Sequence, residues 1–501
     1  MSLRRNVIAN YLGQGWAAAM GLAFVPLYIR YLGMEAYGLI GLFALMQAWL
    51  GLLDMGMTPT LGREMARFTA GARSAQSIRN LLRSLEIVCF SVAIAIGIVV
   101  WAASGWLASD WLKADRLSAG VVQSAIAVMA LVIALRFVEA LYRSALFGLQ
   151  RQVWFNAVNA AIATLRGVGA IVVLAGISTT VEAFFLWQAF VSLISVIVIA
   201  AGVHSSLPRT DIPARLSLKA LHEIRGFAGG MLGIALLSLL LTQVDKVLLS
   251  RLLTLEAFGK YTLAATVAGT LYLVVTPITA ALYPRLVELA SNNDGGELAS
   301  VYQRGAQLVT ALTAPAALLL ALFGDGVLFA WTGNAGLAHS AGPLLSALAC
   351  GTFLNGLMYM PYQLQLAHGW TSLALKVNAV AVAVLVPAIF WIVPAYGAIG
   401  AAWVWIALNA VYVIVSIDLM HRRLLPAEKS RWYLSGIASP LAATGVTLLL
   451  LRVFQPNVLH DRIGWSAFLV GAGLAALVAA AFTVKDFRMR IFPSMRRIRN
   501  A

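Results

Sequence analysis

Apolar segments of about 20 residues, the length a helix needs to cross a bilayer core, recur along the whole chain with short polar connections between them. The pattern predicts an all-α, polytopic integral membrane protein with about 14 transmembrane helices. Gly169, Gly176, Pro394 and Gly397 mark either short connections between spans or breaks within helices. The predicted spans are 6–29, 37–61, 84–107, 119–146, 153–175, 181–203, 227–250, 258–284, 306–330, 341–366, 373–395, 397–420, 433–454 and 463–484.

Composition supports a membrane protein and excludes a soluble one. Hydrophobic residues make up 61% of the chain and charged residues 11%, whereas soluble domains average about 45–50% and 25%. The net charge of +16 would favour nucleic acid in a soluble protein. Here the basic residues lie in short loops between spans, so we expect membrane lipids as surroundings and no nucleic-acid partner.

The distribution of basic residues predicts the orientation. Cytoplasmic loops of membrane proteins carry the excess of lysine and arginine. With a cytoplasmic N-terminus, 26 of the 36 basic residues fall on the cytoplasmic side, 7 fall outside and 3 lie within spans. Both chain ends are therefore expected in the cytoplasm.

An internal repeat predicts two lobes. RYLGMEAYG at 30–38 recurs as RLLTLEAFG at 251–259 with five identities in nine positions, 221 residues later. A weaker match pairs 148–159 with 367–378 at an offset of 219. Parallel repeats of this kind are a transporter architecture with the substrate path between the halves. We expect an N-terminal lobe at 1–203, a cytoplasmic linker at 204–226, a C-terminal lobe at 227–420, two additional helices within 421–484 and a basic cytoplasmic tail at 485–501.

The sequence has no signature of an enzyme. The motifs HExxH, GxxxxGK[ST], paired CxxC and DxD are absent, and the loops are too short for a catalytic domain. We therefore expect a transporter with no catalytic residue, no metal site and no cofactor.

Charged side chains inside spans are costly and by default face a cavity or a partner. Arg136 and Glu139 share one face of the fourth span, and Arg166 lies halfway along the fifth. Glu139 is able to pair with either arginine of its own helix face, Arg136 or Arg143, which leaves a net positive charge on that face. Substrate binding and a structural ion pair both remain open for Arg136 and Arg166.

Polar residues in three other spans complete the candidate set. Asn10 and Gln14 form a stripe on the first span, which faces either a water-filled cavity or neighbouring helices. Asp54 in the second span and Asp245 in the seventh are candidates for ion coupling or gating, and a buried ion pair is the alternative. Lys246 follows Asp245, although adjacent helical residues point about 100° apart and need not pair.

Several motifs resemble one family. The chain reads NxxxN at 6–10, PLYIRYLGMEAYG at 26–38, LDMG at 53–56 and REMAR at 63–67, then GLQR at 148–151 and QVDK at 243–246. This pattern is similar to the polysaccharide transporters of the multidrug/oligosaccharidyl-lipid/polysaccharide exporter superfamily, the Wzx-type flippases. The resemblance covers the first twelve spans.

The resemblance implies two six-helix lobes, alternating access and a bacterial cytoplasmic (inner) membrane. The implied substrate is an undecaprenyl-diphosphate-linked glycan, such as an O-antigen or exopolysaccharide repeat unit, moved to the outer leaflet. A cationic cavity would receive it, a role that falls on Arg136, Arg166 and Lys246. The polymerase and glycosyltransferases of the same pathway are the implied protein partners.

Three alternatives remain. A multidrug-type cation antiporter of the same superfamily would need a cavity dominated by carboxylates, which Arg136 and Arg166 oppose. A lipid II flippase is closer, although the opening motifs suit repeat-unit flippases better. A membrane glycan polymerase or ligase would need a large extracytoplasmic loop or an Asp-rich donor site, and neither is visible in the sequence.

Overall fold

The computed structural model describes residues 3–218, 222, 236, 239–240, 242–292, 294–456 and 461–484, with side chains from residue 9 onward. Helices dominate this part of the chain, which confirms the all-α prediction. The elements up to the inter-lobe linker are α1 Leu3–Ala23, α2 Val25–Leu32, α3 Met34–Leu50, η1 Gly51–Asp54, α4 Met57–Thr69, α5 Ala75–Trp106, η2 Leu107–Trp111, α6 Ala119–Gly148, α7 Gln152–Gly176 and α8 Val181–Ser206.

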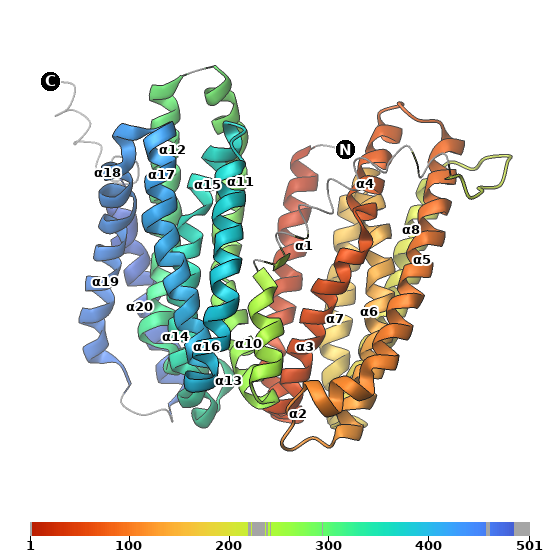
Figure 1. Ribbon diagram of the computed structural model, residues 1–501, viewed down its shortest axis with the longest axis horizontal. Coiled ribbons are helices and arrows are strands. Elements are labelled where there is room, and N and C mark those ends of the chain that lie inside the picture. Colours follow the sequence, from red (N-terminus) through yellow and green to blue (C-terminus); the bar gives the residue numbers. More distant parts are fainter. Residues whose placement is uncertain are drawn as a thin grey trace. The chain divides into compact units, whose positions relative to one another are not determined.

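The remaining elements follow the same helical pattern (Figure 1). They are α10 Leu255–Gly269, α11 Tyr272–Ser291, α12 Gly295–Leu322, α13 Gly324–Thr332, α14 Ala335–Leu357, α15 Tyr359–Ala367, α16 Ser372–Val411, η3 Tyr412–Ser416, α17 Ile417–Leu424, η4 Pro426–Glu428, α18 Lys429–Arg431, η5 Trp432–Ala438, α19 Ser439–Leu451, η6 Arg452–Phe454 and α20 Arg462–Thr483.

Local sequence sets several helix starts. Ser118 accepts a hydrogen bond from the backbone N–H of Val121 at the start of α6, and Thr180 does the same for Ala183 at the start of α8. Asn334 likewise accepts from Leu337 in α14. Side-chain oxygens at this position satisfy N–H groups that have no partner within the helix, so these short polar residues end the connections and begin the spans.

Twelve helical segments of the described chain are long and apolar enough to cross a membrane. One of them, Ser372–Leu424, has 53 residues, about twice the length of a span. It covers both 373–395 and 397–420, and Gly397 (φ 60°, ψ −148°) interrupts it with a non-helical conformation. A non-helical residue is therefore present at Gly397, one of the positions that the sequence marked as either a connection between spans or a break within a helix. The predicted span 227–250 lies largely outside the described residues, so the full count of fourteen stays a prediction.

The chain divides into two compact units, residues 1–259 and 260–501. In the first, α6 is the central helix and packs against α3, α4, α5 and α8, while α1 packs against α7. Figure 1 draws these helices in red to yellow. The start of α10 also belongs to this unit, and the predicted lobe boundaries at 203 and 227 stay a prediction.

In the second unit α12 and α14 are the central helices. The helix α14 packs against α12, α13 and α16, and α12 also contacts α11, α19 and α20. Gly326 of α13 lies directly against the ring of Trp465 in α20. The two C-terminal helices, which fall outside the sequence repeat, thus pack onto the second unit.

The two copies of the repeat meet inside the first unit. A Cβ atom on Gly38 of α3 would lie 2.3 Å from the carbonyl oxygen of Leu255, and one on Gly259 of α10 would lie 2.6 Å from that of Met34. Only glycine permits this approach, because backbone atoms of the facing helix fill the space. We call this contact the glycine crossing.

The loop between η2 and α6 forms hydrogen bonds to the starts of the two helices that meet at the glycine crossing, α3 and α10. The carboxylate of Glu35 accepts hydrogen bonds from the backbone N–H groups of Asp115, Arg116 and Leu117, at 2.6, 2.9 and 3.1 Å. The backbone N–H of Leu255 donates to the carbonyl of Lys113 at 2.8 Å. The acidic residue of the first repeat copy therefore organises a loop that also binds the second copy.

Candidate functional site

Arg136 lies inside the first unit, on the central helix α6. Its Nη1 donates to Oε1 of Gln47 in α3 at 2.9 Å, and its Nη2 donates to Oε1 of Gln188 in α8 at 3.3 Å. The guanidinium carbon is 4.9 Å from the centroid of the Phe43 ring, a cation–π distance. These partners are neutral, so they orient the guanidinium group without compensating its charge.

Arg166 of α7 and Glu139 of α6 form the neighbouring part of the site. The Nη2 of Arg166 is 3.9 Å from Oε2 of Glu139, which is too long for a hydrogen bond. Glu139 thus pairs with Arg166 of the neighbouring helix, whereas the sequence offered Arg136 and Arg143 of its own helix as partners. Arg136, Glu139 and Arg166 together carry a formal charge of +1. We call these three side chains, together with Gln47 and Gln188, the cationic cluster.

Several buried donors of the cationic cluster have no hydrogen-bond partner among the described residues. They are Nε of Arg136 and both Nε and Nη2 of Arg166, while Oε2 of Glu139 lacks a donor. A buried polar group without a partner costs about 1–3 kcal/mol. The cluster is therefore arranged to gain free energy from an added acceptor, and its positive charge favours an anionic one.

The polar stripe of α1 binds a neighbouring helix. Asn10 donates through Nδ2 to Oε1 of Gln152 at 2.9 Å and accepts from Nδ2 of Asn156 at 2.7 Å. Gly13, one turn later, leaves space for the side chain of Asn156. The sequence left open whether the stripe faces a water-filled cavity or neighbouring helices, and Asn10 forms its hydrogen bonds with a neighbouring helix. Gln14 is exposed.

Asp54 stabilises a helix start. Both of its carboxylate oxygens lie 3.0 Å from the backbone N of Thr58 in the first turn of α4, and Oδ1 accepts the Thr58 hydroxyl at 2.7 Å. A carboxylate near a helix N-terminus is also favoured by the helix dipole. These contacts give Asp54 a capping role, and nothing in them tests its predicted role in coupling or gating.

Asp245 and Lys246 contact each other, although their helical spacing did not require it. The Nζ of Lys246 is 3.9 Å from Oδ1 of Asp245 and donates to the carbonyl of Thr242 at 3.0 Å. The contacts described for Lys246 thus lie within its own helical segment. Among the predicted residues, the structure brings Arg136, Glu139 and Arg166 into one cluster and gives Asn10, Asp54 and Lys246 other neighbours.

Two members of the cationic cluster were missed by sequence reasoning. Gln47 and Gln188 are uncharged amides inside the predicted spans 37–61 and 181–203, where polar side chains also need partners. That amide signal was available in the sequence. What the sequence lacked was the packing of α3 and α8 on the same face of α6.

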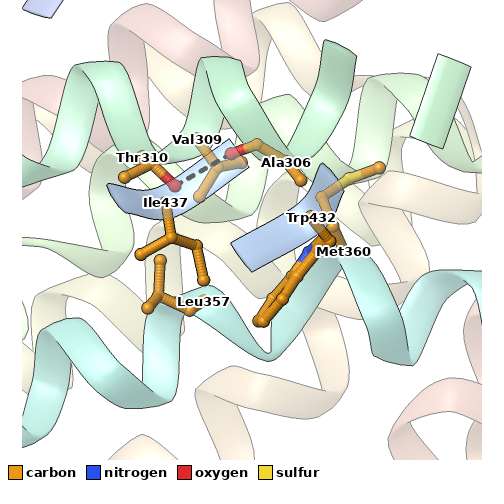
Figure 2. A pocket seen from close by; sticks show the side chains of 7 residues that line it. All are labelled: Ala306, Val309, Thr310, Leu357, Met360, Trp432 and Ile437. Carbon is orange, nitrogen blue, oxygen red and sulfur yellow. Dashed lines mark hydrogen bonds between the residues drawn. The ribbon is translucent and has the colours of Figure 1, made fainter. Parts of the chain in front are cut away.

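The second unit contains an apolar recess where α12, α14, α15 and η5 meet. Thr310 in this recess donates its hydroxyl to the carbonyl of Ala306 at 3.0 Å, within its own helix. The recess offers no charged side chain to a substrate headgroup. Figure 2 shows its lining residues, Ala306, Val309, Thr310, Leu357, Met360, Trp432 and Ile437.

Comparison with known proteins relates the chain to membrane transporters. A family model described as polysaccharide biosynthesis protein matches residues 3–290. A Shigella flexneri protein described as a candidate O-antigen transporter is 22% identical over 409 residues, which cover 81% of this chain and 94% of that protein.

Solved structures show the same fold at low sequence identity. The lipid II flippase MurJ in an inward closed conformation aligns with a TM-score of 0.68 and 11% identity, over 98% of this chain and 99% of that one. The MATE multidrug transporter DinF-BH aligns with a TM-score of 0.58 and 15% identity, over 84% and 95%. The all-α, polytopic membrane fold predicted from the sequence is thereby confirmed, and it is the fold of these two solved structures.

Proposed function

We propose, from the premise that this chain belongs to the polysaccharide biosynthesis protein family, that it moves undecaprenyl-diphosphate-linked oligosaccharide repeat units from the inner to the outer leaflet of a bacterial cytoplasmic membrane. The family and the fold make the chain a membrane transporter and not an enzyme. The glycan-linked lipid as substrate, the direction of transport and the cytoplasmic position of both chain ends are parts of the proposal.

The observation that carries the proposal is the cationic cluster. The buried guanidinium groups of Arg136 and Arg166 have donors without partners, and a diphosphate supplies several charge-assisted acceptors at once. An anion that leaves a negative cell interior also gains about 2.3 kcal/mol per charge per 100 mV. Outward movement of the diphosphate therefore needs no coupling ion, and alternating access between two lobes provides the route.

The experiment that tests this function is deletion of the gene, with lipid-linked oligosaccharides assayed on each leaflet. We expect loss of surface glycan together with complete repeat units accessible only from the cytoplasmic side. Build-up on the outer leaflet would instead assign the chain to polymerisation or ligation. Unchanged glycan with altered sensitivity to cationic drugs would assign it to cation antiport.

A lipid II flippase is a second candidate, because MurJ covers nearly the whole chain at the TM-score of 0.68. The deletion separates the two. Loss of lipid II transport stops peptidoglycan synthesis and lyses the cells, whereas loss of repeat-unit transport removes surface glycan from viable cells. Viable cells without surface glycan would exclude the lipid II function.

Asp54 provides a test of ion coupling within the proposed function. Asp54→Ala removes the cap of α4 and is expected to cost about 1 kcal/mol of stability. Asp54→Asn keeps an oxygen for the Thr58 N–H, so we expect it to fold normally and to retain at least half of the export. A stably inserted Asp54→Asn variant without export would show that the charge itself is needed, as ion coupling or gating requires.

A further inference from the structure

The second unit contains a hydrogen-bonded chain of neutral side chains from three helices. Tyr272 of α11 donates its hydroxyl to Oδ1 of Asn355 in α14 at 2.9 Å. Asn355 donates through Nδ2 to Oδ1 of Asn409 in α16 at 2.8 Å, and Asn409 donates to the carbonyl of Trp405 at 2.8 Å. The ring of Tyr359 lies 5.7 Å from that of Tyr272 at an interplanar angle of 34°. We call Tyr272, Tyr359, Asn355 and Asn409 the neutral cluster.

The sequence repeat makes the neutral cluster the counterpart of the cationic one. Asn409 lies 221 positions after Gln188, which is the offset of the first repeat match. Asn355 lies 219 positions after Arg136, which is the offset of the second match on the same pair of spans. Tyr272 lies 225 positions after Gln47. It is therefore four residues, about one helical turn, beyond the position that the offset of 221 gives on the equivalent span. Each unit thus has a polar centre built from its three equivalent spans.

The two centres differ in charge. The cationic cluster has two guanidinium groups and one carboxylate beside its two amides, whereas the neutral cluster has two amides and two phenols with no charged group among them. Asn409 is fully buried, while Tyr272, Asn355 and Tyr359 are partly exposed. The neutral cluster therefore has one buried amide, that of Asn409, and three partly exposed groups, the rings of Tyr272 and Tyr359 and the amide of Asn355.

We infer that the neutral cluster contacts sugar rings of the transported glycan. This inference rests on the proposed function. Amide and phenol groups both donate and accept hydrogen bonds, as sugar hydroxyls do, and the apolar C–H face of a sugar ring packs against aromatic rings. The neutral cluster contains no cationic side chain that would bind a diphosphate.

A purely structural role predicts a different result. Hydrogen bonds between transmembrane helices contribute about 0.6 kcal/mol each on average, so a cluster that only joins helices would affect stability and leave ligand preference unchanged. A sugar-binding cluster changes the affinity for the glycan-bearing lipid alone. Two ligands that differ only in the glycan therefore separate the two roles.

The test compares the binding of two lipids to purified protein in lipid nanodiscs. One probe is undecaprenyl diphosphate, and the other is the glycan-bearing lipid extracted from the deletion strain. We expect Asn355→Ala and Tyr359→Leu each to weaken binding of the glycan-bearing lipid about tenfold and to leave undecaprenyl diphosphate binding unchanged. Tyr362→Leu, at an exposed position of the same helix α15, is the matched control, and thermal unfolding of every variant is recorded.

The outcomes distinguish failure of the sugar-site inference from failure of the proposed transport function. Equal weakening of both lipids, or no weakening of either by a folded variant, would overturn the neutral cluster as a sugar site and leave the proposed function standing. Failure of the wild-type protein to bind either lipid would overturn both. If Asn355→Ala does not fold, Tyr359→Leu decides alone, since Tyr359 lies outside the hydrogen-bonded chain.

Discussion

Arg136→Gln is expected to lower the rate of surface glycan export by about 10- to 100-fold. A hydrogen bond to a charged group contributes about 1.5–3 kcal/mol, and each 1.4 kcal/mol corresponds to a factor of about ten. Glutamine removes the charge while keeping an amide beside Gln47 and Gln188. Arg166→Gln is expected to act in the same direction and also leaves Glu139 without its cation. The measurement is glycan export in the deletion strain complemented at low expression.

Two controls separate loss of binding from loss of folding. Arg143→Gln changes an exposed arginine on the same helix, α6, and should export normally. Arg136→Lys keeps the charge and should recover export only in part, because an ammonium group does not reproduce the two-pronged contact of a guanidinium group with a diphosphate. Normal export by both Arg136→Gln and Arg166→Gln would remove the two arginines from the binding site.

Gly259→Ala is expected to lower the free energy of unfolding by about 1–3 kcal/mol, the usual cost of overpacking. The added methyl carbon would lie 2.6 Å from the carbonyl oxygen of Met34 and 3.1 Å from the backbone N of Gly38. Both are backbone atoms, so α3 and α10 would have to separate. Gly38→Ala meets the carbonyl oxygen of Leu255 at 2.3 Å and should act similarly. Thermal unfolding in detergent measures the effect.

Gly269, on the same helix α10, is the matched control. No atom lies within 4 Å of a Cβ at this position, so Gly269→Ala should be neutral or stabilising by up to about 1 kcal/mol through helix propensity. An equal loss of stability in Gly259→Ala and Gly269→Ala would mean that the glycine crossing is not a tight contact.

The large features of the fold followed from the sequence because they depend on simple patterns. Long apolar segments predict spans without any knowledge of their neighbours, and RYLGMEAYG and RLLTLEAFG revealed the repeat. The break at Gly397 was also visible as one of two interpretations. The contact between the two repeat copies was not, since no one-dimensional pattern shows which helices cross.

The candidate site followed only in part for the same reason. Charge alone singled out Arg136, Glu139 and Arg166, because ionised groups are costly in a span wherever they point. The partners of Arg136 required knowledge of packing. So did the pairing of Glu139 with Arg166, since the sequence offered Glu139 only the arginines of its own helix, Arg136 and Arg143. Asp54 caps the start of α4 through hydrogen bonds with Thr58. The sequence pointed to ion coupling, gating or a buried ion pair for Asp54, and not to this role.

The glycine crossing also relates the two repeat copies to each other. Gly38 and Gly259 are equivalent positions of the repeat, and each approaches the backbone at the start of the other's helix. In a symmetric dimer, contacts of this type join the same surface of two identical subunits. The two repeat copies thus make with each other, within one chain, a contact of the kind that joins identical subunits, with one glycine from each copy.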